Sequence, residues 1–265
     1  MELNLKGRLA LVTGSTRGLG KAIAMSLAQE GVEVIINGRY EVSVIETMKK
    51  ISDIYQVQTW ACPVDVTDNK AIKTFFELGP IAAKGSLDIL VNNVGNIERF
   101  GSFTDLEDED WLRCYDLTFM SAVRFIRSAL PFLTASGSGR IINISSLIAH
   151  QPGNNFPHYA PAKAALNNLT KYLAGILGNR NITVNAICPS NVDWQKNVED
   201  RAKRDGISIR DAQVKILEVE RGKSPLGTVG SPEDVANLAV YLSSSRADFL
   251  TGHIYNVDGG ITRGI

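Results

Sequence analysis

The sequence predicts an α/β fold in which helices wrap a doubly wound, mostly parallel seven-stranded sheet. Short apolar runs alternate with longer amphipathic stretches over most of the 265 residues. Several short runs are β-branched and apolar nearly throughout, which is typical of strands covered on both faces. No repeat, low-complexity tract or Gly/Pro-rich linker divides the chain. We therefore expect residues 1–265 to form a single domain.

The alternating pattern assigns the elements in chain order. Strands are expected at Leu9–Val12, Val32–Ile36, Val57–Ala61, Ile89–Val91, Arg140–Ile144, Thr183–Ile187 and Ile254–Val257. Helices are expected near residues 19–30, 41–54, 68–84, 107–133, 158–178 and 232–243. The last of these has the clearest start, because Ser231 is suited to cap it, Pro232 to open it, and acids follow in the first turn.

One segment, residues 190–230, breaks the alternation because it is polar, dense in charge and lacks a strand. It is expected to form one or two surface helices. Ligands of doubly wound sheets bind outside the carboxyl ends of the strands, and this insertion leaves the sheet from that edge. It is therefore either a helical lid over a substrate or a solvated hairpin without function.

Composition excludes several classes of partner. Formal net charge is zero, so no basic field favours nucleic acid or an anionic membrane. No apolar run approaches the 18 residues of a membrane span, and no signal peptide is evident. The cysteines, Cys62, Cys114 and Cys188, show no ligand spacing and are expected to be reduced core residues. We expect a cytoplasmic protein that binds no metal.

A glycine-rich loop follows the first expected strand. Residues 13–20 read Thr-Gly-Ser-Thr-Arg-Gly-Leu-Gly and lead into a helix from about Gly18. Glycines let the backbone approach a pyrophosphate, whose charge is stabilised by the helix N-terminus. The loop therefore predicts a dinucleotide site.

The end of the second strand indicates which dinucleotide binds. An acid there would favour NAD by hydrogen-bonding the ribose 2′-hydroxyl, but the first acid after Asn37 is Glu41. Arg39, with help from Arg17 in the glycine loop, could instead pair with the 2′-phosphate of NADP. We expect NADP, the alternative for Arg39 being a solvated surface arginine.

Tyr159 and Lys163 lie four residues apart on an expected helix and so share one face. A neighbouring ammonium would lower the pKa of the phenol and make it a usable general acid or base. Tyrosine and lysine at this spacing are also common on solvated helices, so the pair gains meaning only from the rest of the sequence.

Together these features resemble the short-chain dehydrogenase/reductase family nearly end to end, most closely its 3-oxoacyl-carrier-protein reductase and glucose dehydrogenase type. The loop at residues 13–20, Asn92–Gly95 after the fourth strand, Ser145-Ser146 after the fifth, and Asp258–Gly260 after the last each resemble a family motif in the family's order. The resemblance implies a Rossmann-type fold and a homotetramer built on the helices at 107–133 and 158–178 and the C-terminal strand.

Roles follow from the resemblance residue by residue. Tyr159 would exchange the proton, Lys163 would lower its pKa and hold the nicotinamide ribose, and Ser146, 13 residues before the tyrosine, would bind the carbonyl oxygen. Ser145 is then a structural neighbour. The implied cofactor residues are Gly14, Ser15, Thr16, Arg17, Gly18, Leu19, Gly20, Arg39, Asp65, Val66, Asn93, Gly95, Tyr159, Lys163 and Pro189.

Three positions depart from the family pattern. Thr118 replaces an asparagine thought to hold a helix distortion and a relay water, Ser190 replaces a glycine after Pro189, and Trp194 replaces a threonine near the nicotinamide. The substrate pocket is expected to include Ile148, Phe156 and Trp194, although Trp194 could equally pack beneath the lid. His150 and His158 are interpreted as loop residues.

These inferences predict an NADP(H)-dependent oxidoreductase that interconverts a ketone or aldehyde with an alcohol of a small molecule. Two alternatives remain: an NADP-binding sensor or scaffold with little catalysis, and an epimerase or dehydratase on the same fold. The intact Ser146, Tyr159 and Lys163 argue against the first.

Overall fold

The computed structural model describes residues 2–153, 156–192 and 196–263. In these residues seven strands form one sheet in the order β3-β2-β1-β4-β5-β6-β7, and every neighbouring pair is parallel. The strands are β1 Leu9–Val12, β2 Glu33–Gly38, β3 Thr59–Pro63, β4 Ile89–Asn92, β5 Arg140–Ile144, β6 Thr183–Pro189 and β7 Ile254–Val257. The predicted fold is confirmed; β2 and β3 lie one or two residues later than expected, and β6 extends to Pro189.

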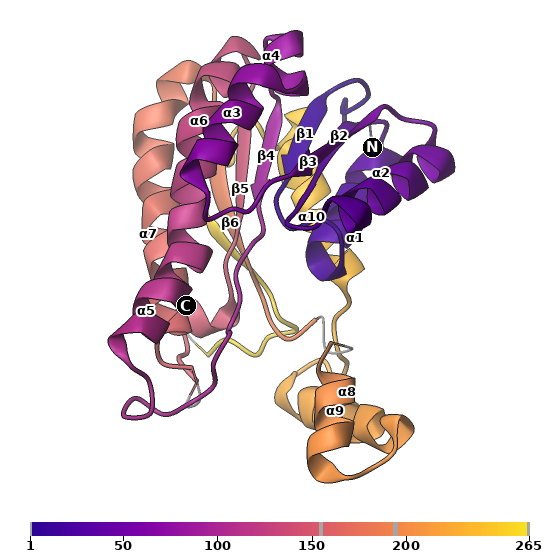
Figure 1. Cartoon of the computed structure of the whole chain (residues 1–265), viewed down its shortest axis with the longest axis vertical. Helices are drawn as coiled ribbons and strands as arrows, with labels where there is room; N and C mark the ends of the chain where they lie inside the picture. The colour runs from indigo at the N-terminus through magenta and orange to yellow at the C-terminus, as the bar shows by residue number, and fades with distance from the viewer. Residues whose placement is uncertain (1, 154–155, 193–195, 264–265) are drawn as a thin grey trace.

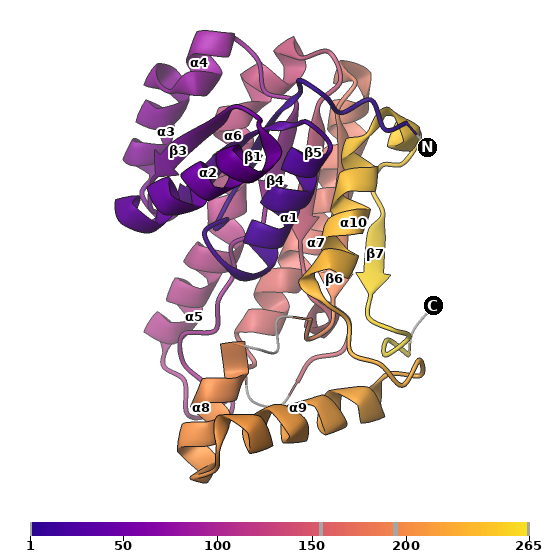
Figure 2. The same cartoon turned by 90° about the vertical axis from the view of Figure 1, so that its right-hand side faces the viewer.

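Helices cover both faces of the sheet (Figures 1 and 2). One layer contains α1 Gly18–Gln29, α2 Glu41–Tyr55 and α10 Pro232–Ser243, and the other contains α3 Asn69–Leu78, α6 Ser121–Ala135 and α7 Tyr159–Leu177. Successive strand residues alternate between the layers: Val12 and Ile36 pack in the core under α1 and α10, whereas Leu11 and Ile35 pack under α3, α6 and α7. This double burial explains why the strand segments are almost wholly apolar. None of the described helices is long and apolar enough to cross a membrane.

The single helix expected over residues 68–84 is two helices. α3 ends at Leu78, and α4 spans Pro80–Lys84 with its proline in the first turn. Proline disfavours helical conformation in the residue before it, and Gly79 is accordingly extended, with φ −87° and ψ −171°. The expectation of one continuous helix was therefore wrong at the Gly79-Pro80 step.

The helix expected over residues 107–133 is also interrupted. α5 spans Asp108–Tyr115, a π-helical turn follows at Asp116–Met120, and α6 continues to Ala135. The amide of Ser121 donates to the carbonyl of Asp116, five residues back, and the Ser121 hydroxyl donates to Leu117 O at 2.6 Å. The distortion that the family pattern associates with asparagine is thus present with Thr118 at its centre.

The insertion after β6 forms two helices, α8 Lys196–Asp205 and α9 Ile209–Lys223. They pack on each other through a small cluster of their own, made of Val198, Ala202, Ala212 and Ile216 with Ile207 beside them. Figures 1 and 2 show this α8–α9 hairpin projecting from the carboxyl end of the sheet, apart from the two helical layers. The insertion was expected to form one or two surface helices, and it forms two.

Candidate active site

The strand order reverses at β1, which pairs with β2 on one side and β4 on the other. In open parallel sheets such a reversal leaves a crevice at the carboxyl ends of the two diverging strands. The glycine loop follows β1 and residues 93–95 follow β4, so both predicted cofactor segments lie at this crevice.

The glycines permit a close fit between the two loops. Gly14 and Gly18 have φ of +61° and +53°, which side chains with a Cβ rarely adopt. A Cβ on Gly14 would lie 2.9 Å from Val94 Cγ2, and one on Gly20 would lie 2.5 Å from Asn93 Nδ2. Asn93 in turn donates to Thr13 O at 3.0 Å. The residues at the crevice therefore form a cradle of bare backbone that fits a dinucleotide phosphate at the start of α1.

Asn37 ties the glycine loop to β2. It is wholly buried, its Oδ1 accepts from Gly14 N at 3.1 Å, and its Nδ2 donates to the carbonyls of Cys62 and Val64 at 3.0 Å each. Because its amide is fully engaged, Asn37 holds the loop in place and has no free donor for a ligand.

Arg17 and Arg39 are both exposed at the same end of the sheet. Their backbones are close, because a Cβ on Gly38 would lie 2.8 Å from Thr16 Cγ2. The Arg39 guanidinium lies over the Tyr40 ring, 5.6 Å from its centroid. Among the described residues neither arginine has an acidic partner within ion-pair distance. Two positive charges thus remain unneutralised beside the cradle.

Asp65 and Val66 follow β3 near this edge. Val66 is buried, while the half-buried Asp65 accepts from Thr67 N and Thr67 Oγ1 at 2.9 and 2.8 Å. The carboxylate therefore orders the turn in which both residues lie.

Tyr159 and Lys163 face the segment after β4, in the first turns of α7. A Cβ on Gly95 would lie 2.7 Å from Lys163 Nζ and 3.3 Å from the Tyr159 hydroxyl oxygen. Lys163 Nζ lies 5.5 Å from the Tyr159 ring centroid and donates to Ile144 O, at the end of β5, at 2.6 Å. The predicted pair is thus assembled where β4, β5 and α7 meet.

Burial controls the titration of this pair. It lowers the pKa of the Lys163 ammonium to about 8, and it raises the pKa of the Tyr159 phenol well above its ordinary value. The sequence led us to expect that Lys163 would lower the pKa of Tyr159, and in this structure the net direction is the opposite. The reason is that desolvation of the buried phenolate outweighs any attraction by the neighbouring ammonium.

The two serines after β5 differ in accessibility. Ser145 is buried and its hydroxyl donates to Lys163 O at 3.3 Å. Ser146 is half-buried, and its Oγ accepts from Ile148 N at 3.4 Å, where it caps the short 3₁₀ turn Leu147–Ala149. Among the described residues the Ser146 hydroxyl accepts but does not donate, so its hydrogen is available for another acceptor.

Thr118 is wholly buried in the π-helical turn. Its Oγ1 lies 3.9 Å from Cys114 Sγ, one helical turn earlier, and that sulfur lies 3.9 Å from Asn96 O. The Cys114 thiol is also close enough to Tyr159 and Lys163 to influence the pKa of each. All three cysteines are free and buried, as expected.

Two of the three predicted pocket residues lie in the part of the chain that the structure describes. Ile148 and Phe156 are half-buried in the segment that joins Ser146 to Tyr159, whereas Trp194 lies outside the described residues. Pro189 ends β6 and is buried.

The two loop histidines differ from each other. Both lie in turns, as expected for loop residues; His150 is exposed, with Nε2 3.7 Å from Cys188 Sγ. His158, just before α7, is buried, and its ring packs edge-on against Trp111 at 6.1 Å between centroids. Burial lowers the pKa of its imidazole.

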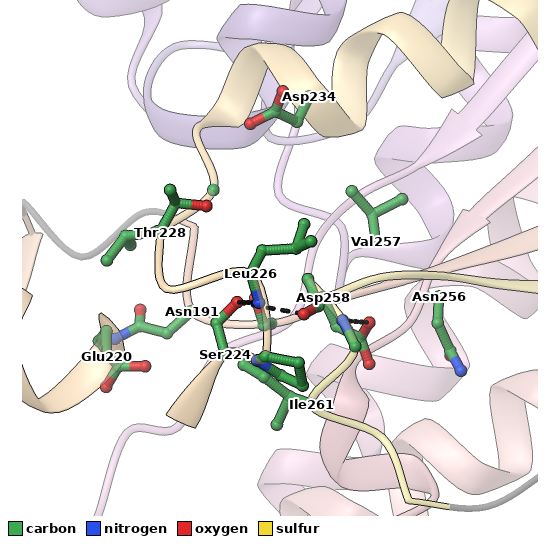
Figure 3. Close-up of a pocket in the computed structure, with 16 residues that line it drawn as sticks. Asn191, Glu220, Ser224, Leu226, Thr228, Asp234, Asn256, Val257, Asp258 and Ile261 are labelled. Atoms are coloured by element: carbon green, nitrogen blue, oxygen red, sulfur yellow. Dashed lines mark hydrogen bonds between the residues drawn. The ribbon is translucent and has the colours of Figure 1, made fainter. Parts of the chain in front are cut away.

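A cavity of about 570 Å³ lies at the base of the α8–α9 hairpin (Figure 3). Its walls come from both connections of the hairpin and from the segment after β7, where Ser224 Oγ donates to Gly259 O at 3.1 Å. The serine, tyrosine and lysine of the predicted site are not among its described lining residues.

Some neighbours of the site were missed at the sequence level. Cys114 and Cys188 were interpreted only as core cysteines, and Phe100 in the β4–α5 connection received no role. The four-residue spacing of Cys114 and Thr118 on one expected helix was an available signal, whereas the pairing of Phe100 with Phe156 needs the three-dimensional structure.

Comparison with known proteins places this geometry in a family. The family model described as enoyl-(acyl carrier protein) reductase matches residues 14–262. The 3-oxoacyl-(acyl-carrier-protein) reductase FabG of Aquifex aeolicus is 33% identical, over 98% of this chain and 100% of the relative.

Two solved structures are also similar over nearly their whole length. L-sorbose reductase from Gluconobacter frateurii, complexed with NADPH and L-sorbose, has a TM-score of 0.93 at 32% identity and full coverage of both chains. A 7α-hydroxysteroid dehydrogenase complexed with NADH and 7-oxo glycochenodeoxycholic acid has a TM-score of 0.85 at 30% identity, covering 98% of this chain and 96% of the other. With a family model spanning almost the entire sequence and relatives above 30% identity, the chain belongs to the short-chain dehydrogenase/reductase family and is an oxidoreductase.

Proposed function

We propose that this protein is an NADP(H)-dependent reductase that converts a ketone or aldehyde of a small molecule to an alcohol. The observation that carries the proposal is the meeting of Tyr159, Lys163 and the bare backbone of Gly95 at the carboxyl ends of β4 and β5. The lack of a side chain at Gly95 lets the segment after β4 lie against both groups, so a carbonyl that reaches the Tyr159 hydroxyl would be close to an acid, a cation and the crevice that fits a dinucleotide.

The cradle supports a nicotinamide dinucleotide, and the charges beside it support NADP. The nicotinamide supplies the hydride when it is bound. The phosphates of the dinucleotide would lie on the amides of residues 14–20 at the start of α1. The rest of the cofactor would be bordered by Asp65, Val66 and Pro189. Arg17 and Arg39 would pair with the 2′-phosphate, because both are exposed, are carried by touching segments and have no acidic partner in the described part of the chain. The solved relatives include one bound to NADPH and one bound to NADH. The preference of this chain for NADP over NAD is therefore proposed from these two arginines.

The catalytic roles follow from accessibility and burial. Ser146, whose hydroxyl hydrogen is free, would donate to the substrate oxygen. Tyr159 would deliver the proton, and its raised pKa keeps it protonated at neutral pH. In reduction the phenol acts as the acid. Lys163 would stabilise the phenolate left behind and hold the nicotinamide ribose.

The α8–α9 hairpin is proposed to be a substrate lid. It has its own small core and joins the body through the segments that line the cavity of Figure 3. Such a unit can rotate without disrupting the main cores. Ile148, Phe156 and Trp194 would line the space that it covers.

Consumption of NADPH across a panel of ketones and aldehydes tests the proposed activity. We expect at least one carbonyl compound to be turned over, with NADH clearly less effective than NADPH. Tight binding of NADPH without turnover of any compound would instead favour a binding protein. Retention of a nucleotide through purification would favour an epimerase or dehydratase.

The pKa of Lys163 predicts a pH dependence. Because that pKa is about 8, the ammonium is present below this pH and is lost as the pH rises through it. We expect kcat for reduction to fall about tenfold per pH unit above about 8. The measurement is kcat at saturating cofactor from about pH 6 to pH 10, with circular dichroism to verify folding. A kcat that stays constant over this range would contradict a role for the ammonium.

Homotetramer formation is the proposed assembly. Leu112 on α5 and Tyr172 on α7 are 70% and 62% exposed, so helices of the region expected to form the interface carry uncovered apolar surface. Light scattering should give four times the chain mass, and a monomer would refute the assembly.

A further inference from the structure

An exposed aromatic ring lies in the connection that follows Gly95 and contacts the segment that leads to Tyr159. Phe100, in the connection between β4 and α5, keeps 66% of its surface exposed. Its ring meets that of Phe156 edge to face, with centroids 6.2 Å apart and planes at 78°. The segment of Phe100 begins at Gly95 and that of Phe156 ends at Tyr159, so the two segments that carry the site meet through this pair.

Phe156 has a defined position relative to Tyr159. Its carbonyl accepts from Tyr159 N at 3.2 Å, in the turn that opens α7. A Cβ on Gly153 would lie 3.0 Å from both Cε2 and Cζ of the Phe156 ring. The ring is therefore held between the backbone of Gly153 and the edge of Phe100, three residues from the phenol.

Phe100 is also held, although it is exposed. The preceding Arg99 pairs with Asp110 Oδ2 at 2.7 Å, and the same oxygen accepts from Glu107 N in the cap of α5. On the other side, Asp105 Oδ2 accepts from Ser102 N and Oγ at 2.8 and 2.6 Å. Anchors on both sides of Phe100 mean that its exposure does not come from a loose loop.

A positioned, uncovered phenylalanine favours ligands that can cover it. Removing its apolar surface from water is favourable, and aromatic rings add a preference for edge-to-face or offset contact. A methyl or hydroxymethyl group is too small to gain much from either effect, whereas a ring attached to the substrate carbon chain gains from both.

We propose that Phe100 and Phe156 form an aromatic wall that selects carbonyl compounds bearing an aromatic or alicyclic ring a few bonds from the reacting carbon. This inference deepens the proposed reductase function and rests on it, because the wall is placed relative to Tyr159. Phe100 is then a specificity-determining residue of the substrate site.

Two ketones with the same reacting group separate the wall from the chemistry. Benzylacetone and butanone are both methyl ketones, but only the first carries a phenyl ring. We expect Phe100→Ala to lower kcat/KM about fivefold for benzylacetone and less than twofold for butanone. Phe156→Ala should act in the same direction, and the double variant should lose less than the product of the single losses, because the two rings share one contact.

Phe103 provides a matched control in the same loop. It is 72% exposed, and its ring also makes an edge-to-face contact, but with Trp111, at 5.9 Å and 78°. Phe103→Ala should leave kcat/KM for both ketones unchanged. Equal effects of Phe100→Ala on the two ketones, or no effect on either, would overturn the wall.

A binding measurement keeps failure of the wall distinct from failure of the reductase function. Saturation-transfer NMR on the full chain with NADP⁺ should show transfer to the phenyl protons of benzylacetone, reduced several-fold in Phe100→Ala and unchanged in Phe103→Ala. If no ketone is reduced but this pattern of saturation transfer is observed, the proposed reductase function is refuted and the aromatic wall is supported. If benzylacetone is reduced with a Tyr159-dependent rate that Phe100→Ala does not alter, the wall fails alone.

Discussion

Replacing Tyr159 with phenylalanine is expected to lower kcat for carbonyl reduction about 10³-fold, the middle of the range for loss of a positioned general acid. The substitution removes only the hydroxyl, whose oxygen lies near Lys163 and would be 3.3 Å from a Cβ on Gly95. The half-buried ring remains, so packing at the start of α7 is retained. NADPH affinity, measured by fluorescence titration, should change less than about threefold, because the glycine loop and the two arginines are untouched.

Tyr55→Phe is the matched control, since Tyr55 is half-buried at the end of α2, in the helical layer on the other face of the sheet from α7. It removes a hydroxyl without touching the site, and its kcat should equal that of the unaltered protein. If Tyr159→Phe retains more than a tenth of the rate, another group supplies the proton. The Lys163 ammonium could then be the acid itself. In that case kcat of the variant would still fall as the pH rises through the pKa of Lys163.

The sheet was predictable because its strands are buried on both faces. Leu9–Val12 is wholly apolar, Arg140–Ile144 is buried at every residue, and both match the predicted bounds residue for residue. The interruptions of the helices expected over residues 68–84 and 107–133 were not predicted from the pattern of apolar residues. Gly79-Pro80 did carry a local signal that was overlooked, whereas the π-helical turn at Asp116–Met120 depends on a shifted backbone hydrogen bond that no side-chain periodicity records.

At the site, positions were easier to predict than environments. The spacing of Tyr159 and Lys163 placed both on one face of α7, and their proximity is confirmed by the contacts at Gly95. The prediction that the pKa of Tyr159 is lowered was wrong, because the loss of solvent around the phenol depends on the packing of β4, β5 and α7 together. His158 is a loop residue as predicted, but its burial could not be read from its own segment, because it comes from Trp111 of α5, far away in the sequence.

Arg39→Ala is expected to raise KM for NADPH about thirtyfold and to leave KM for NADH nearly unchanged. A charge-assisted hydrogen bond contributes about 2 kcal/mol, which corresponds to roughly thirtyfold in affinity. NADH lacks the 2′-phosphate and so loses nothing from that interaction. Steady-state kinetics with both cofactors measures the difference, and Arg17→Ala should act in the same direction with a smaller effect, since Arg17 is the supporting partner.

The position of Arg39 over Tyr40 creates a competing outcome that these kinetics can distinguish. If the guanidinium instead stacks on the adenine, as it does on the Tyr40 ring at 5.6 Å, then Arg39→Ala would raise KM for NADPH and NADH equally. Ionic strength separates the two cases further, because pairing with a phosphate weakens as salt is added, while stacking is less affected. Arg180→Ala, at an exposed arginine outside the crevice, should change neither KM. A selective loss for NADPH that diminishes in high salt would therefore assign the 2′-phosphate to Arg39, whereas an equal, salt-insensitive loss would refute that assignment and leave the cofactor preference to other residues.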